Sequence, residues 1–178
     1  MLTIKHIMSA GSFKTEVFLV QTSLIAIMSA LVAVATLIFR IPNPMGGYFN
    51  LGDVAIFIVA LTFNPAVGGL ASGIGSAIAD LIGFPAFAIP TLIIKGLEGF
   101  LASLVSGRKS LLRDVITVVL AGGEMILGYF LVELLVFQWG WAGALAEVPG
   151  NVTQIVIGGV FGIPIAYVVR RRLPEILK

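Results

Sequence analysis

The chain has 178 residues, of which 58% are hydrophobic and 11% are charged, and its mean hydropathy is +1.09. Because a soluble domain carries roughly 25% charged residues, this composition indicates an integral membrane protein. The net charge of +2 is too small to favour a nucleic-acid-binding protein, and the sequence has no cysteine for disulfides or thiolate metal sites. The single histidine, His6, lies in a polar N-terminal stretch, so we expect no histidine-based metal or catalytic site.

The apolar segments predict an all-α fold with six transmembrane helices in a single domain, residues 1–178. The first segment follows a polar stretch, residues 1–16, and at about 1.5 Å per residue it is long enough to cross a hydrocarbon core of about 30 Å. The second is short, because Asn64-Pro65 interrupts it. The expected helices are 17–39, 51–63, 66–82, 88–106, 114–137 and 149–169.

The basic residues predict the orientation of these helices. With six spans, both termini, the turn between the second and third helices and the loop between the fourth and fifth share one side. Nine of the eleven Lys and Arg residues fall on that side, so the positive-inside rule places both termini in the cytoplasm. The proline- and glycine-containing loop 41–50 and the loop 138–147, with Trp139 and Trp141, then face outward.

Four charged residues interrupt the most apolar part of the chain: Asp53, Asp80, Lys95 and Glu98. A charge at bilayer depth costs about 3 kcal/mol on insertion scales, so each needs a partner, a wet cavity or a ligand. Lys95 and Glu98 are three residues apart on a helix and could neutralise each other, or Lys95 could pair with an aspartate. We interpret Asp53, Asp80 and Lys95 as paired structural charges, whereas Glu98 stays open between pairing and ligand contact.

Other polar residues favour ligand contact, because no cation is evident near them. Tyr129 and Glu133 lie four residues apart on one face of the fifth helix, and Asn151 and Gln154 share a stripe of the sixth. Together with Tyr48 they suggest a polar pocket that opens outward and is capped by loop 41–50. The candidate substrate-binding residues are Tyr48, Glu98, Tyr129, Glu133, Asn151 and Gln154.

The motifs that would indicate an enzyme are missing from the sequence, which contains neither a P-loop nor an HExxH or GxSxG pattern. One enzymatic alternative remains, in which Asp53 and Asp80 form an intramembrane aspartyl dyad that shares a proton. Both aspartates lie at helix ends near water, which argues against this alternative. A non-transporting structural membrane subunit is the other alternative.

The order and spacing of several segments resemble a known family. The segments NLGDVAIFIVALTFNPAVGGLASGIGSAIADLIG, PTLIIKGLEG, GYFLVE and PGNVTQ are similar to those of the substrate-binding S components of energy-coupling-factor (ECF) vitamin transporters, over about residues 22–169. The nearest branch is the one with riboflavin, hydroxymethylpyrimidine and pyridoxine-type substrates.

The resemblance implies a six-helix bundle in the prokaryotic plasma membrane that binds a vitamin near its outer face, under the first loop. It also implies a transmembrane T component and two cytoplasmic ATPases as partners, so that ATP is used by the partners and this chain needs no cofactor. The small-residue face of the family's first helix corresponds to Ala26 and Ala30, which would then dock the T component.

The candidate residues also bear on the substrate. A carboxylate and amides beside aromatic rings suit a small heteroaromatic ring with amino or hydroxymethyl donors. This favours hydroxymethylpyrimidine, thiamine or pyridoxine over a multiply anionic ligand such as folate, and riboflavin remains open.

Overall fold

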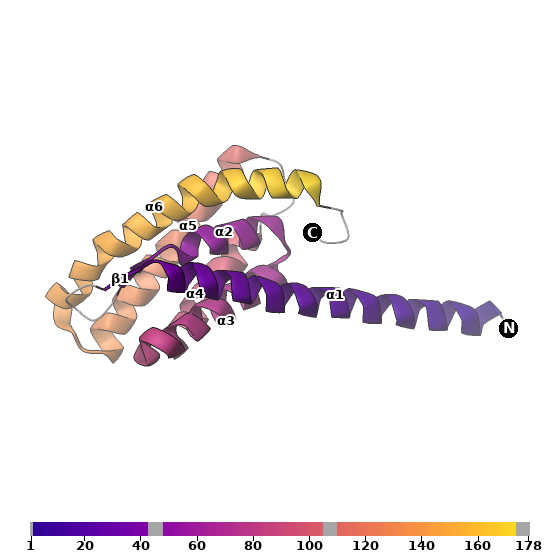
Figure 1. Ribbon diagram of the computed structural model, residues 1–178, viewed down its shortest axis with the longest axis horizontal. Coiled ribbons are helices and arrows are strands. Elements are labelled where there is room, and N and C mark those ends of the chain that lie inside the picture. Colours follow the sequence, from indigo (N-terminus) through magenta and orange to yellow (C-terminus); the bar gives the residue numbers. More distant parts are fainter. Residues whose placement is uncertain (1, 43–47, 105–109, 174–178) are drawn as a thin grey trace.

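The computed structural model describes the backbone of residues 2–42, 48–104 and 110–173, and the side chains of these residues from Thr15 onward except Pro42. The described chain is a bundle of helices with one small hairpin at one end (Figure 1). The middle of the predicted capping loop, residues 43–47, and the basic pair Arg108 and Lys109 lie outside the described residues. The elements are α1 (Leu2–Ile38), β1 (Arg40–Pro42), β2 (Tyr48–Asn50), α2 (Gly52–Thr62), α3 (Pro65–Gly83), a 3-10 turn η1 (Pro85–Phe87), α4 (Ala88–Ser103), α5 (Leu111–Leu131), a π-helical turn η2 (Val132–Val136) and α6 (Gly140–Arg172).

Within the described residues, five helical segments are long and apolar enough to cross a membrane. They are Thr15–Ile38, Pro65–Gly83, Pro85–Ser103, Leu111–Val136 and Gly140–Arg172. The remaining helix, α2, has 11 residues and is therefore about 16 Å long, roughly half of a hydrocarbon core. The structure thus supplies five candidate spans and one short apolar helix where the sequence predicted six spans.

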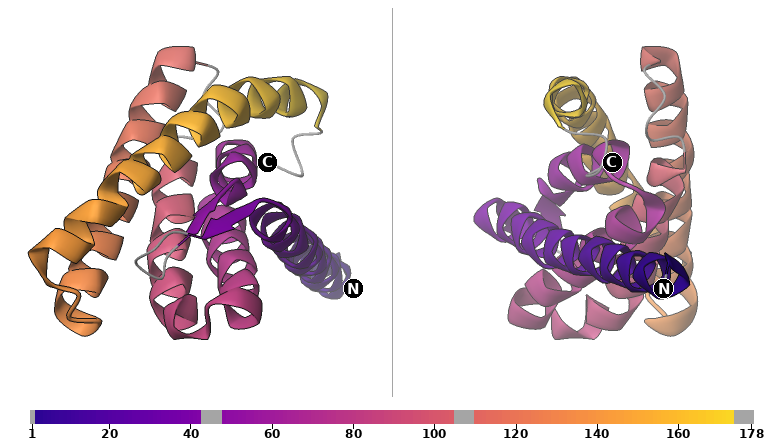
Figure 2. Two further views of the ribbon diagram at one scale, coloured as in Figure 1. Left: turned by 60° about the vertical axis from the view of Figure 1, so that its left-hand side comes forward. Right: turned by 90° about the vertical axis from the view of Figure 1, so that its right-hand side faces the viewer.

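The short helix α2 forms the centre of the bundle. Its side chains Ile56, Phe57 and Leu61 are fully buried. Both views of Figure 2 show α2 between α1 and α6, and α3 and α4 also contact it. Burial of most of its side chains explains why α2 is largely apolar, with a single charged residue, Asp53, in its first turn.

The helix α1 is continuous from Leu2, so the expected boundary between a polar stretch and a first helix at residue 17 is not a break in the backbone. Figure 1 shows its N-terminal turns extending beyond the rest of the bundle. In the span Thr15–Ile38 a narrow stripe is buried, which includes Ser29, Val32 and Thr36, whereas Ala26 and Ala30 are exposed.

The helix α6 begins at Gly140, nine residues before the expected start at Pro149. The sequence analysis placed a loop over residues 138–147 and the start of the sixth helix at Pro149. In the structure Pro149 lies inside α6, where it removes one intrahelical donor, a loss that membrane-spanning helices tolerate. Most of the loop predicted over residues 138–147 is therefore helical, and its residues share the faces of α6.

Glycines allow α6 and α2 to approach closely. A Cβ atom added at Gly158 would lie 2.9 Å from the Cβ of Asp53, and one added at Gly162 would lie 2.9 Å from the Cβ of Phe57. Small residues at such crossings let helix backbones pack against each other in lipid. This contact fixes which face of α6 points to the bundle interior.

The far end of the α5–α6 pair is held by a buried ion pair. Arg170 donates two hydrogen bonds to the carboxylate of Asp114, one of them with Nη1 3.1 Å from Oδ1. The sequence analysis counted Arg170 among the basic residues that set the orientation. The structure instead buries Arg170 to 4% exposure, whereas its neighbour Arg171 is exposed and lies over the Tyr167 ring.

Candidate functional site

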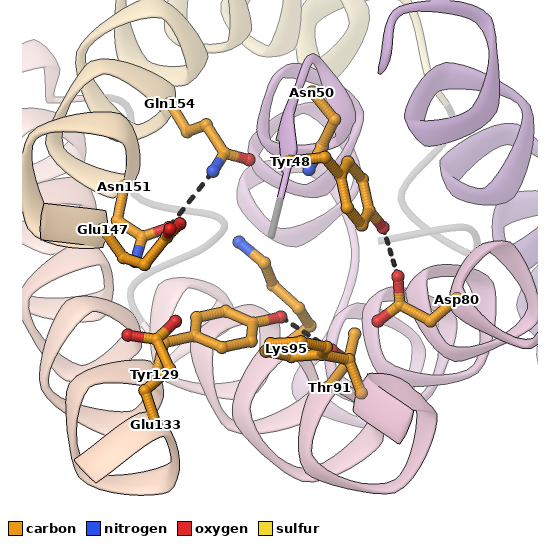
Figure 3. Close-up of a pocket in the computed structure, with 11 residues that line it drawn as sticks. Tyr48, Asn50, Asp80, Thr91, Lys95, Tyr129, Glu133, Glu147, Asn151 and Gln154 are labelled. Atoms are coloured by element: carbon orange, nitrogen blue, oxygen red, sulfur yellow. Dashed lines mark hydrogen bonds between the residues drawn. The ribbon is translucent and has the colours of Figure 1, made fainter. Parts of the chain in front are cut away.

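A polar cavity of about 40 Å³ lies at the hairpin end of the bundle (Figure 3). This volume is smaller than the range of about 300–1,000 Å³ that is usual for small-molecule sites, so a ligand would have to displace lining side chains. Its wall is formed by β2, the end of α3, η1, α4, the end of α5, η2 and the start of α6. The lining residues are Tyr48, Asn50, Asp80, Phe87, Thr91, Lys95, Tyr129, Glu133, Glu147, Asn151 and Gln154.

The hairpin is fastened to the C-terminal end of α3 on one side of this cavity. The Tyr48 hydroxyl donates a hydrogen bond to Asp80, and the Tyr48 ring stacks on Phe84 with 4.6 Å between centroids. Arg40 donates to the carbonyl of Ala79 and lies 5.1 Å above the Tyr48 ring. Burial, and then the charge of Asp80, raise the pKa of Tyr48 well above its ordinary value. Tyr48 is therefore a neutral phenol and a hydrogen-bond donor throughout the physiological pH range.

Asp80 accepts a hydrogen bond from the Tyr48 hydroxyl, and its side chain lines the cavity. Its predicted role as a paired structural charge stays a prediction.

A buried charge cluster lies under the cavity, and we name Asp53, Lys95 and Glu98 together the triad. The Lys95 ammonium donates to Asp53 and to Glu98, with Nζ 2.9 Å from Glu98 Oε2. The three residues are exposed by 1%, 4% and 0%, respectively. Asp53 on α2 and Lys95 on α4 are 42 residues apart in the chain, so the triad joins two helices across the bundle core.

Lys95 connects the triad to the cavity. An ammonium has three N–H donors, and two of them are used by the carboxylates. The amine nevertheless lines the cavity and lies 5.9 Å from the centroid of the Tyr129 ring. Glu98 is not among the described residues that line the cavity, because it lies behind Lys95. Glu98 contributes to the site by holding the Lys95 side chain in place.

The opposite wall comes from the end of α5, the π-helical turn and the start of α6. The Tyr129 hydroxyl lies 2.8 Å from Thr91 Oγ1, and the Tyr129 and Phe87 ring centroids are 6.4 Å apart. Glu133 is the second residue of the π-helical turn η2. Single π-helical turns are local distortions of a helix that are frequent at functional sites. Gln154 donates to Asn151, with Nε2 3.2 Å from Oδ1.

The structure brings five of the six candidate substrate-binding residues to one cavity, and Glu98 is the exception. Among the lining residues that the sequence analysis did not assign to the pocket is Glu147 on α6. Glu147, Asn151 and Gln154 are spaced four and three residues apart, which places all three on one helix face. The signal was present in the sequence, but the helix was expected to start after Glu147.

The aspartyl-dyad alternative needs two carboxylates that share one proton. In the structure Asp53 is bound to Lys95, and Asp80 accepts a hydrogen bond from Tyr48. Each carboxylate has a different partner, and Asp53 is not among the described residues that line the cavity.

Comparison with known proteins identifies the family of the chain. Residues 17–171 match the family model described as ECF-type riboflavin transporter, S component. The chain belongs to this ECF S-component family. Members are substrate-binding subunits of transporters rather than enzymes, and they work with a T component and ATPases. The protein is thus a multi-pass protein of the cell membrane.

Two relatives of the S component illustrate the range of similarity. A protein from Pyrococcus woesei, described as an uncharacterized protein in a gap 3′ region, is 42% identical over 149 residues, which cover 83% of this chain and 99% of the relative. The thiamine precursor transporter HmpT of Lactococcus lactis subsp. cremoris is 30% identical over 154 residues, which cover 85% of this chain and 88% of HmpT.

The triad predicts a specific pattern of stability. Replacing Lys95 with Met leaves two buried carboxylates without their cation, and breaking a buried ion pair in this way costs about 3–5 kcal/mol. We expect the melting temperature of purified K95M protein to fall clearly, and the triple variant K95M/D53N/E98Q to recover most of the loss. R171M, which removes an exposed cation from α6, is the control and should change little. A K95M protein as stable as the unchanged protein would contradict this account.

Proposed function

We propose that this S component captures a small heteroaromatic vitamin or vitamin precursor in the cavity at its hairpin end, and delivers it to the cytoplasm with a T component and two ATPases. The observation that carries the proposal is the cavity itself. It is partly open, and it is lined by aromatic rings together with a few convergent polar groups. Binding sites for small molecules have this composition.

The direction of capture follows from charge and topology. The cavity lies at the end of the bundle opposite to Arg171 and Arg172, which end α6. By the positive-inside rule those arginines are cytoplasmic, so the cavity opens outward and both termini are cytoplasmic. In this topology α2 carries the chain from the hairpin end back toward the start of α3, and it serves as a sixth, shortened crossing.

The lining residues support a pyrimidine or pyridine vitamin as the substrate. Tyr129 and Phe87 offer ring faces, Lys95 offers a donor, and Glu133, Asn151 and Gln154 offer a carboxylate and two amides. Such a set suits a ring of the hydroxymethylpyrimidine, thiamine or pyridoxine type, and the name of the relative HmpT points the same way. Riboflavin, named in the family model, is the second candidate.

Glu98 and Tyr48 take supporting roles in this proposal. Glu98 and Asp53 hold the Lys95 ammonium at the floor of the cavity. Tyr48 closes the hairpin side of the cavity through its bond to Asp80 and contacts the substrate from there. The ligand contacts that we expect to dominate affinity are those of Lys95, Glu133, Asn151 and Gln154.

The test is a binding assay on the purified protein without nucleotide. We expect one of hydroxymethylpyrimidine, thiamine, pyridoxine or riboflavin to bind, and at a concentration of 100 Kd to stabilise the fold by about 2.7 kcal/mol. N151A should weaken binding at least tenfold, because it removes an amide at the cavity wall. T153A, which changes an exposed neighbour on the same helix, should bind like the unchanged protein. Failure of every B vitamin to raise the melting temperature would count against the proposal.

Docking of the T component is assigned to the exposed small-residue face of α1. Ala26 and Ala30 lie one turn apart and expose a flat surface on a helix that contacts the bundle along its other side. Small residues permit close approach of a second membrane helix.

This assignment predicts that A26L and A30L lower recovery of the S component with co-expressed T component and ATPases, while vitamin binding by the isolated protein is retained. A142L places the same side chain at an exposed alanine of α6 and should assemble normally. Assembly of A26L and A30L at the level of A142L would exclude this face.

A further inference from the structure

One side of the cavity is unusually rich in hydrogen-bond acceptors. Glu133 on η2 and Glu147 and Gln154 on α6 line the cavity, and they are exposed by 3%, 7% and 5%, respectively. Figure 3 shows Glu133 and Glu147 on the same side, across from Tyr48 and Asp80. We name these three residues the acceptor wall.

The acceptor wall has more acceptors than the surrounding protein satisfies. Glu133 Oε2 and Gln154 Oε1 are buried and receive no hydrogen bond from the described residues. The Gln154 amide nitrogen is already used, because it donates to Asn151. Buried acceptors without a donor cost free energy, so an arrangement of this kind is complementary to a ligand that supplies the missing donors.

Charge points to the same kind of ligand. Glu133 and Glu147 are two carboxylates that line the same small cavity, so their negative charges repel each other. Among the described residues that line the cavity, the cation is Lys95. Its charge is neutralised by Asp53 and Glu98, so it does not neutralise Glu133 and Glu147. A positively charged donor placed against the acceptor wall would relieve this repulsion.

We propose that the acceptor wall selects a substrate that presents an amino group on a protonated heteroaromatic ring, bound as a cation, with Glu147 as a second specificity-determining carboxylate. The inference rests on the proposed vitamin-binding function and defines the charge and orientation of its substrate. The ring N–H and the amino group of such a cation are donors, and charge-assisted hydrogen bonds from them to the carboxylates of the wall are stronger than neutral ones. The acceptor groups of the substrate, such as a hydroxymethyl oxygen, then face the Lys95 ammonium.

Two nearly isosteric ligands test this selection. The probes are 4-amino-5-hydroxymethyl-2-methylpyrimidine and its 4-oxo analogue, in which a carbonyl acceptor replaces the amino donor. Sites built around a hydrogen bond reject analogues that lack it by large factors, so we expect the full-length protein to bind the amino compound at least about 100-fold more tightly. E133Q and E147Q keep the side-chain shape and remove the charge, and each should narrow this ratio to about tenfold or less.

E124Q is the matched control, because it neutralises a carboxylate on α5 that is not among the described residues lining the cavity. It should leave the ratio unchanged, and melting temperatures of all variants establish that they are folded. A ratio within about threefold for the unchanged protein, or a ratio that both variants leave intact, would overturn the inference. Binding of riboflavin in place of either pyrimidine would overturn it while the proposed function stands, whereas binding of no vitamin would reject both.

Discussion

The interaction on which the rest of this structure depends is the buried triad of Asp53, Lys95 and Glu98. Charges in a membrane bundle are stable when they are paired and hydrogen-bonded, and removal of one partner leaves the others at high cost. The triad therefore fixes the position of α2 relative to α4 in the centre of the bundle. It also fixes the Lys95 amine at the floor of the cavity, where a flexible four-carbon side chain would otherwise be free to move.

The helix α6 extends this constraint to the wall of the cavity. One face of α6 carries Gly158 and Gly162, which pack against Asp53 and Phe57 of α2. The same face, one to three turns earlier, carries Gln154, Asn151 and Glu147, which line the cavity. The rotation of α6 about its own axis that lets Gly158 and Gly162 pack against α2 therefore also directs Gln154, Asn151 and Glu147 into the cavity. A single face of α6 thus determines both helix packing and the polar wall of the cavity.

The sequence predicted much of this and missed some of it for identifiable physical reasons. The ends of α2 and α3 lie within a residue or so of the expected positions, because Asn64-Pro65 marks the break between them locally. The start of α6 was wrong, because residues 140–147 were expected to form a loop but are helical, and Pro149 is tolerated inside a membrane helix. That error placed Glu147 in a loop, so the sequence analysis did not recognise that Glu147 and Asn151 lie four residues apart on the same helix face. The bond between Tyr48 and Asp80 joins residues 32 positions apart, and no local pattern encodes such a contact.

The measurement that tests the central claim most directly is native mass spectrometry of the protein after incubation with an equimolar mixture of B vitamins and their precursors. The account predicts one bound small molecule per chain with the mass of a heteroaromatic vitamin or precursor, and loss of that adduct when Asn151 and Gln154 are both replaced by alanine. Spectra in which the unchanged protein retains none of the mixture, or in which the double variant retains it equally, would contradict the assignment of this cavity as the substrate site.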